Sequence, residues 1–507
     1  MSKGLKDSMI RCMKRSPSSG WIVALTLAAL LAPMGAAAHA QQSGSNVAAI
    51  DAYIEAQTSR HHIQGLAVAI THDDETIHAR GYGTAGEGRS VQADTPFYLG
   101  SVSKSFTALA VMQLVDAGRI ELDRAVQDYL PWFEVADSAA SAQITVRQLL
   151  NQTSGLSRAS YTDAPRLPDA SLEESVRSLK SARPTAAVGT EFQYFNPNYT
   201  ALGLLIEAVS GQSYGEYMAD HIFEPLQMKR SFTSREAAEQ AGLAQGYNAF
   251  FGFPVPRRQP HLAYDLPAGF IISTAEDMAH YLIAQMNGTY SGRTIISPAS
   301  LAEMHRPPAG VDSTYAMGWE VGQWKGMHAI RHDGSLETFY ASAVLLPDEN
   351  YGVALLANQV SYPHMLFAYE DIVQGVVDRL VGHTPEPGVS MTTVYLIFSS
   401  IAVVTLAFQV RSLLRLDRWR EQIEDRVSPP MVLGTLWKLI FGIFVLLIVP
   451  WLLIQNAGLA ATRASILNYL PDVSFWLGLM AVLSLIEAVL RVGYLVQMKR
   501  GGEIEYA

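Results

Sequence analysis

The sequence contains a single cysteine, Cys12, which lies ahead of the position where we expect a signal peptide to be cleaved. A mature chain without a thiol forms no disulfide and offers no cysteine ligand to a metal. Histidines cluster between positions 61 and 78, but neither a His-Glu-x-x-His motif nor a helical histidine pair accompanies them. We therefore expect no metal ion and no other cofactor.

Charged residues are also scarce, at 17% of the 507 positions, whereas hydrophobic residues make up 49%. The formal net charge is −10, and no basic stripe occurs outside the termini and the expected membrane loops. This charge balance argues against a nucleic-acid partner. The hydrophobic excess is concentrated at the two ends of the chain, and no internal repeat lies between them.

At the N-terminus, basic residues lead into an apolar run over residues 21–31. Ala38-His39-Ala40 then matches the small-x-small pattern of a cleavage site, and the run is too short to span a bilayer comfortably. We interpret residues 1–40 as a cleaved secretory signal peptide. An uncleaved N-terminal anchor is the alternative.

At the C-terminus, three segments are apolar enough to cross a membrane: residues 391–410, 431–454 and 474–497. The loop after the first segment carries five arginines, and the tail after the third carries Lys499 and Arg500. Because basic loops stay in the cytoplasm, this pattern places residues 41–388 on the outer side of the membrane. Residues 389–507 would then form a membrane domain.

Between these ends, the periodicity predicts strands over residues 65–70 and 76–82, followed by mostly helical segments as far as residue 286. Residues 157–190 look like an irregular connection. Strands are predicted again over residues 315–324, 328–332, 339–346 and 353–358, and a closing helix over 369–380. This order favours one α+β domain whose antiparallel sheet draws strands from both ends of the segment.

The first candidate for chemistry is Ser101-x-x-Lys104, at a predicted junction between a loop and a helix. Residues three apart share one face of the first helical turn. A serine hydroxyl needs a neighbouring base, and an amine serves only when it is unprotonated. Burial and the positive end of a helix dipole both lower a lysine pKa from its free value of about 10.4. A surface serine beside a solvated lysine is the alternative.

Two later segments supply possible partners. In Tyr194-Phe195-Asn196, a phenol could shuttle a proton to a leaving group, and an amide could orient the lysine or the substrate. At the end of a predicted strand, Gly334 would let a substrate lie against the backbone, and the N–H of Ser335 could stabilise an oxyanion. Each segment alone is also compatible with an ordinary loop or turn.

Taken in order, the three segments resemble the three motifs of the class C β-lactamase and penicillin-binding serine hydrolases. The matching positions are Ser101 and Lys104, then Tyr194 and Asn196, then His332 and Gly334. Segments 149–156, 267–270 and 273–278 resemble the same family, and the resemblance covers about residues 46–380.

The resemblance implies a fold with an α/β part and an all-α part, with the site in the cleft between them. It also implies an acyl-enzyme formed on Ser101, with the base role shared by Lys104 and Tyr194. The N–H groups of Ser101 and Ser335 would form the oxyanion hole, and Asn196, His332 and Gly334 would contact the substrate. The lactamases and peptidases usually have lysine where this chain has His332, which weakens the case for a β-lactam or C-terminal D-alanine substrate.

A rival motif, Gly211-Gln212-Ser213-Tyr214-Gly215, matches the Gly-x-Ser-x-Gly elbow of α/β-hydrolases. That elbow requires a strand before the serine, whereas residues 202–209 have helical periodicity. We therefore interpret Ser213 as a helix cap in a turn between two helices.

The sequence thus predicts a serine hydrolase in the inner membrane of a bacterium, with its catalytic domain on the periplasmic or extracellular side. Its substrate would be a small peptide, amide or ester, such as a cell-wall peptide or a D-amino-acid derivative. A class C-like β-lactamase, a sensor that is acylated without turnover, and a scaffold with a decayed site are the alternatives. No protein partner can be named from the sequence.

Overall fold

The structure is a computed structural model that describes residues 47–160, 170–425, 429–444 and 469–501. The chain divides into two compact units, Met1–Ala52 and Tyr53–Ala507. The described part of the first unit, residues 47–52, is helical. The signal peptide predicted for residues 1–40 lies outside the described residues. All elements discussed below belong to the second unit.

A seven-stranded sheet forms the centre of the region that precedes the C-terminal helices. Its strand order is β10-β11-β12-β13-β1-β2-β3. All neighbouring strands are antiparallel. The first strand pairs with one from the far end of the region, with Leu66 opposite Ala357, so the prediction that both ends contribute to the sheet is confirmed. The strands are β1 Gly65–His72, β2 Glu75–Gly86, β3 Arg89–Ser90, β10 Glu320–Trp324, β11 Met327–Ser335, β12 Tyr340–Leu346 and β13 Tyr351–Ala357.

Burial along the strands explains their position in the sheet. In β12 every residue is buried, and in β13 every residue except the first, as expected for central strands covered on both faces. The longer strand β2 mixes exposed and buried residues because it lies near an edge. Helix α10 (Ala275–Asn287) packs against β1 and β13, and α12 (Glu370–Leu380) contacts β13.

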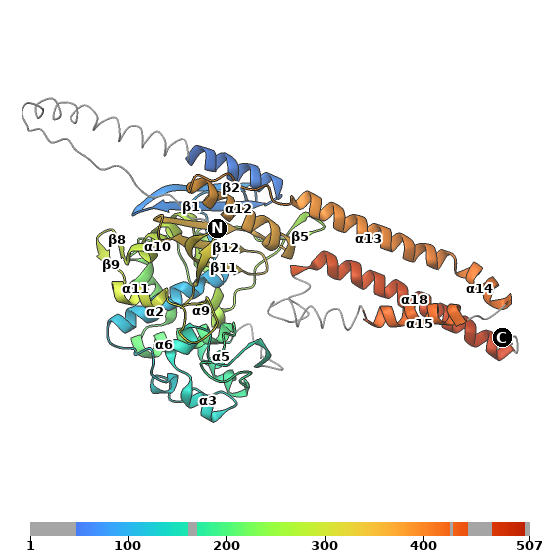
Figure 1. Cartoon of the computed structure of the whole chain (residues 1–507), viewed down its shortest axis with the longest axis horizontal. Coiled ribbons are helices and arrows are strands. Elements are labelled where there is room, and N and C mark those ends of the chain that lie inside the picture. The colour runs from blue at the N-terminus through green and yellow to red at the C-terminus, as the bar shows by residue number, and fades with distance from the viewer. Residues whose placement is uncertain (1–46, 161–169, 426–428, 445–468, 502–507) are drawn as a thin grey trace, which may run out of the picture. The chain divides into compact units, whose positions relative to one another are not determined.

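The remaining helices form an all-α part, drawn below the sheet in Figure 1. At its centre, α2 (Ser103–Asp116) is buried on all sides through its first ten residues. It packs against α6 (Asn196–Ser210), α9 (Leu266–Gly269) and α11 (Pro298–Met304). The shorter helices are α3 Ser138–Gln143, α4 Val146–Leu150, α5 Leu172–Arg177, α7 Tyr214–Met218 and α8 Arg235–Gln240.

Small sheets connect the two parts. Strand β4 (Phe97–Tyr98) pairs with β7 (Ile272–Ser273), and β8 (Thr289–Tyr290) pairs with β9 (Arg293–Thr294). A third sheet has the order β14-β5-β6, from Gln359–Val360, Tyr247–Phe250 and Phe253–Pro256.

Several predicted boundaries were wrong. The strand predicted over residues 315–324 begins only at Glu320, because residues 316–319 are buried in a turn that contains Gly318 at φ 76°. The helix predicted from Ser101 starts with a 3₁₀ turn, Gly100–Val102, and becomes α-helical at Ser103. The segment 157–190, predicted as irregular, contains helix α5, which begins with a Ser171–Glu174 capping box.

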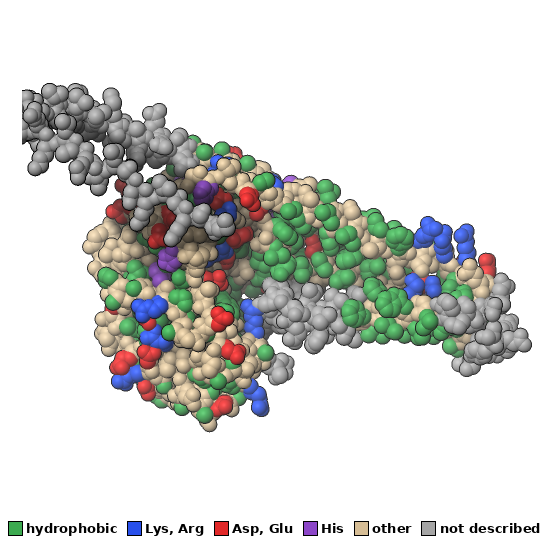
Figure 2. All heavy atoms as spheres, viewed as in Figure 1, with side chains coloured by type: hydrophobic (Ala, Val, Ile, Leu, Met, Phe, Trp, Pro, Cys, Tyr) green, Lys and Arg blue, Asp and Glu red, His purple; other side chains and the backbone are tan. Residues whose placement is uncertain are grey.

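The C-terminal region contains α13 (Met391–Leu414), α14 (Leu416–Asp425), α15 (Pro429–Ile443) and α18 (Pro471–Gly501). Within the described residues, two helices are long and apolar enough to cross a membrane, Met391–Leu414 and Pro471–Met498. The third span, predicted for residues 431–454, appears only as the shorter apolar helix Met431–Ile443, and its remainder lies mostly outside the described residues. Figure 2 shows hydrophobic side chains covering this region, with basic side chains gathered at one end.

These helices meet at Glu487, a fully buried carboxylate of α18. Lys438 Nζ lies 2.8 Å and Arg491 2.5 Å from its oxygens. Ser412 of α13 also donates a hydrogen bond of 2.7 Å to it. Arg491, four residues further along α18, therefore neutralises this carboxylate, and Lys438 adds a second cation from another helix.

Candidate active site

Ser101 lies in the 3₁₀ turn between β4 and α2. The pairing of β4 with β7 and the hydrogen bond of 2.9 Å from Leu99 N to Ile271 O hold the chain just before this turn. Gly100 adopts φ 53°, a conformation that costs other residues free energy. The turn therefore presents Ser101, which is half-buried, at the start of a helix that is itself fixed in the core.

Lys104 extends from the first turn of α2 and is completely buried. Its Nζ lies 3.0 Å from Ser101 Oγ and donates a hydrogen bond of 2.6 Å to Ala268 O. Burial lowers the pKa of Lys104 to about 7; Asp265 opposes this shift and Arg158 adds to it. A substantial fraction of the amine is then unprotonated near neutral pH, as a base requires.

Tyr194 stands on the other side of this pair. Lys104 Nζ lies 4.8 Å from the centre of its ring, and its hydroxyl hydrogen-bonds with Ser101. Burial raises the pKa of Tyr194, so the phenol keeps its proton at neutral pH. The structure thus brings together Ser101, Lys104 and Tyr194, the three residues predicted to be catalytic.

Gln152 holds the loop that carries Tyr194. This residue is fully buried, and its Oε1 accepts hydrogen bonds from Phe195 N at 3.1 Å and Asn198 Nδ2 at 2.7 Å. Its role is therefore to fix the loop.

Asn196 points toward a carboxylate that sequence reasoning missed. Its Nδ2 lies 3.4 Å from Asp265 Oδ2, and Thr200 donates a hydrogen bond of 3.1 Å to Asp265 Oδ1. Burial raises the pKa of Asp265, and the positive charge of Lys104 opposes that shift. No motif signals Asp265, because only the fold brings its loop next to α2.

The end of β11 meets the Ser101 turn backbone to backbone. A Cβ placed on Gly100 would lie 2.7 Å from Ser335 N, and one placed on Gly334 would lie 2.7 Å from Ser101 N. Only glycine permits such an approach at both positions. The contact brings the backbone of Ser101 close to the backbone of Ser335. An oxyanion hole needs two amide donors at one site, so this approach is compatible with the oxyanion hole that the resemblance implies.

His332 lies in β11 beside this contact and is buried. Its Nδ1 is 2.7 Å from Asp333 O, and its Nε2 is 3.3 Å from the hydroxyl of Tyr315. Burial lowers the pKa of His332 to about 4, with the nearby Lys104 charge as a second cause. The imidazole is therefore neutral at pH 7 and supplies no cation for a substrate.

Arg158 and Tyr469 also border the site, and sequence reasoning missed both. The guanidinium carbon of Arg158 lies 5.7 Å from the centre of the Tyr194 ring. Within the part of the chain that the structure describes, no carboxylate forms an ion pair with Arg158. Tyr469, just before α18, hydrogen-bonds to Ser335, and burial raises its pKa to about 12.

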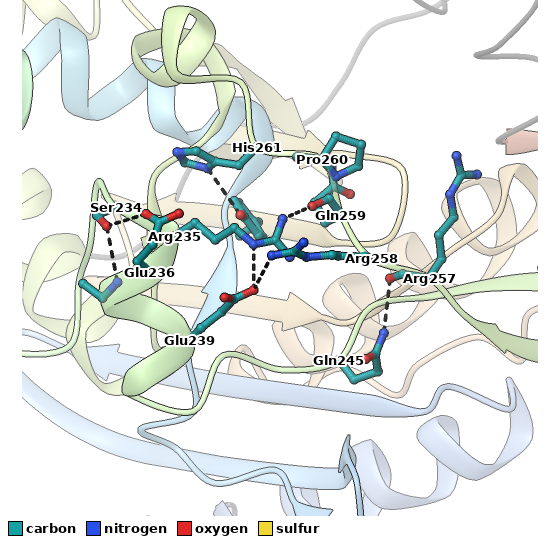
Figure 3. Close-up of polar contacts among 12 residues, drawn as sticks. Ser234, Arg235, Glu236, Glu239, Gln245, Arg257, Arg258, Gln259, Pro260 and His261 are labelled. Atoms are coloured by element: carbon teal, nitrogen blue, oxygen red, sulfur yellow. Dashed lines mark hydrogen bonds and ion pairs between the residues drawn. The ribbon is translucent and has the colours of Figure 1, made fainter. Parts of the chain in front are cut away.

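Figure 3 shows a polar network around Arg235, Glu239 and Gln259. Arg235 Nε lies 2.7 Å from Glu239, and the same guanidinium donates to the carbonyl of Gln259. Gln259 Oε1 in turn accepts hydrogen bonds from the backbone and the hydroxyl of Thr338, both at 3.0 Å. The network therefore fixes the segment directly after Ser335.

The rival serine, Ser213, is remote from this chemistry. It follows helix α6 rather than a strand, and it forms a capping box with Glu216 at the start of α7. The local structure is therefore that of a helix cap, as predicted from the periodicity.

A protein-family model described as beta-lactamase matches residues 50–374, more than half of the chain. The chain belongs to the beta-lactamase family. The resemblance inferred from the three motifs is therefore confirmed, and with it the α+β fold of this family of serine hydrolases.

Two members of the family with curated names are similar in sequence. Protein flp of Staphylococcus aureus strain MW2 is 31% identical over 314 residues, which cover 61% of this chain and 62% of that protein. Penicillin-binding protein 4 of Amycolatopsis lactamdurans is 30% identical over 321 residues, covering 60% of this chain and 83% of that protein. The chain thus spans under two thirds of the length of protein flp.

Among solved structures, the octameric penicillin-binding protein homologue from Pyrococcus abyssi superimposes with a TM-score of 0.58 at 27% identity. The match covers 67% of this chain and 78% of that one.

Proposed function

We propose that the chain is a membrane-anchored serine hydrolase that acts outside the cytoplasm through an acyl-enzyme on Ser101. The observation that carries the proposal is the completely buried Lys104, whose amine lies 3.0 Å from Ser101 Oγ and has a lowered pKa. A buried lysine without a nearby reaction partner would be costly, because burial disfavours its charged form. Next to a serine, the same burial lowers the pKa of the lysine, so that its unprotonated amine can accept the serine proton.

The proposed chemistry begins with attack of Ser101 Oγ on the carbonyl carbon of an amide or ester, while Lys104 Nζ takes the hydroxyl proton. The carbonyl oxygen becomes an oxyanion that the N–H groups of Ser101 and Ser335 stabilise. Tyr194 donates its proton to the leaving amine or alcohol as the carbonyl–leaving-group bond breaks, and it regains a proton from the protonated Lys104. Water then attacks the acyl-enzyme and releases the acid.

The substrate is proposed to be a cell-wall peptide, a D-amino-acid derivative or a related ester. The neutral His332 offers a hydrogen bond rather than a charge, and this favours a peptidase or esterase over a β-lactamase. Asn196 and Gly334 would contact the bound acyl group. The two candidate spans, α13 and α18, support a multi-pass anchor in a bacterial inner membrane.

The test uses the full-length protein in detergent, with Ser101→Ala and Ser213→Ala as a matched pair. Each protein is mixed with a chromogenic cephalosporin, p-nitrophenyl esters and D-aminoacyl anilides, while product release and intact mass are followed together. We expect steady turnover of an ester or anilide that Ser101→Ala abolishes and Ser213→Ala leaves unchanged.

Other outcomes would redirect the proposal. Preferred turnover of the cephalosporin would indicate a β-lactamase, and a stoichiometric mass gain without turnover would indicate a sensor. Turnover that survives in Ser101→Ala and disappears in Ser213→Ala would contradict the proposed nucleophile.

A further inference from the structure

The segment 335–337, which we call the rim of the active site, is contacted by a residue that precedes one candidate span. Tyr469, two residues before α18, hydrogen-bonds to Ser335, the residue that follows the Gly334 contact. Glu337, slightly further along the same rim, also lies close enough to act on the Tyr469 hydroxyl through its charge. The rim is therefore next to the first turn of a membrane helix.

The hairpin formed by β5 and β6 ties both helices to this rim. Phe250 packs edge-on against Phe475 of α18 with ring centres 5.7 Å apart, and Phe251 packs against Phe398 of α13 at 5.4 Å. Two residues before Phe250 in β5, Asn248 Nδ2 donates a hydrogen bond of 3.1 Å to Glu337 O. The hairpin thus links the helix ends to the segment after β11.

A second set of contacts holds the start of α13. Tyr395 lies in the first turns of α13, and its hydroxyl is 3.1 Å from the hydroxyl of Ser361. The ring of Tyr395 lies against Gly252 of the hairpin. Ser361 directly follows β14, which pairs with β5. The same small sheet therefore contacts both candidate spans.

Exposed apolar side chains gather on these elements. Outside the C-terminal helices, the described chain has six exposed large hydrophobic residues, and five of them belong to the hairpin, to the π-helix His364–Tyr369 that contacts α13, or to the linker before α13. They are Phe253, Val255, Leu366, Phe367 and Val389. Phe253 is 73% exposed although it is a large aromatic residue. Aromatic residues at the ends of membrane helices lie at the level of the lipid headgroups.

We propose that this apolar surface rests on the outer leaflet of the bilayer, and that the active site takes its substrate from the membrane, as an ester or amide carried by a lipid anchor. The occupant of the surface is lipid because the surface continues directly into the outer ends of two helices suited to span a bilayer. With Tyr469 on its rim, the site opens at headgroup level. A soluble substrate would gain nothing from this placement, whereas a membrane-anchored one would be held next to Ser101 at high effective concentration.

The inference rests on the proposed hydrolase function, and the experiment separates the two. Full-length protein is reconstituted in phosphatidylcholine vesicles with either of two probes. One is the butyrate ester of hydroxycoumarin, which is soluble, and the other is the same ester with a hexadecyl chain on the coumarin. Hydrolysis is followed by fluorescence while inert lipid dilutes the anchored probe in the surface at constant bulk concentration.

We expect kcat/KM for the anchored probe to exceed that for the soluble probe by about tenfold or more, and its rate to fall with surface dilution. Phe253→Asp should lower hydrolysis of the anchored probe about fivefold and change that of the soluble probe by less than about twofold. Thr289→Asp, which places the same charge on the exposed β8–β9 hairpin, should affect neither probe.

Equal kcat/KM for both probes, or a rate that does not respond to surface dilution, would overturn the membrane-derived substrate while leaving the hydrolase intact. Equal loss of both activities in Phe253→Asp would also overturn it, because the residue would then act through the fold. Absence of turnover with either probe would overturn the hydrolase function itself, and this inference with it.

Discussion

Gly100 and Gly334 pack against each other so closely that a methyl group on either would overlap the other's backbone segment. The contact joins the turn that carries Ser101 to the end of β11, two segments that are far apart in the sequence. It is the structural basis for the proposal that the amides of Ser101 and Ser335 act together, and it leads to a direct test.

Gly334→Ala should strongly slow acylation. The new Cβ would lie 2.7 Å from Ser101 N and would force β11 away from the turn, so one oxyanion donor would be lost. Losing one such donor costs about 100- to 1,000-fold in rate. The rate of labelling by a p-nitrophenyl ester measures the effect. Gly322→Ala in β10 is the control, because its Cβ would meet nothing within 4 Å, and equal losses in both variants would contradict the geometric argument.

The rate of acylation should rise with pH through the lowered pKa of Lys104, near pH 7. Only the unprotonated amine can accept the serine proton, so the active fraction is lost as pH falls through that pKa. The pH dependence of kcat/KM measures the pKa of this base. A profile that is flat between about pH 5 and pH 9 would exclude Lys104 as the base.

Two neighbouring charges should move this profile in opposite directions. Asp265→Asn removes a negative charge that favours protonated Lys104, so the acidic limb should shift to lower pH by roughly one unit. Arg158→Gln removes a positive charge that disfavours protonated Lys104, so the acidic limb of the pH profile should shift to higher pH by roughly half a unit. Arg158→Lys keeps the charge and should leave the limb in place. Shifts of the same sign in Asp265→Asn and Arg158→Gln would rule out the electrostatic explanation.

Tyr194→Phe should lower acylation by about 100-fold or more, because the phenol that transfers the proton to the leaving group is removed while Ser101 and Lys104 remain. The loss should be larger for an anilide than for a p-nitrophenyl ester, since an amine leaves only with a proton. Tyr290→Phe, at a half-buried tyrosine on β8, serves as the control. Equal effects on both substrates would indicate that Tyr194 acts only by packing.

In the membrane region, Glu487→Gln should destabilise the helices. The substitution leaves Lys438 and Arg491 without their shared carboxylate, and removing one partner of a buried ion pair costs roughly 3–5 kcal/mol. Thermal unfolding of the detergent-solubilised protein measures the change in midpoint. Glu421→Gln on the exposed face of α14 should be neutral, and an unchanged midpoint for Glu487→Gln would show that the ion pairs contribute nothing.

The sequence by itself determined the family, the α+β class and the candidate nucleophile, because these depend on local chemistry. A serine and a lysine one helical turn apart, a Tyr-x-Asn before a helix, and a glycine at a strand end are short-range patterns that survive without any knowledge of packing. Apolar runs near the C-terminus likewise indicated the two candidate membrane helices α13 and α18 through composition alone.

The tertiary structure alone decided which distant residues share the site. Asp265, Arg158 and Tyr469 carry no motif. They act on Lys104 or Ser335 only because separate loops and the segment before α18 fold close to these residues. Burial, which lowers the pKa of Lys104 and keeps His332 neutral, is also a property of the packed chain. Sequence patterns record neighbours along the chain, whereas charge interactions and desolvation depend on neighbours in space.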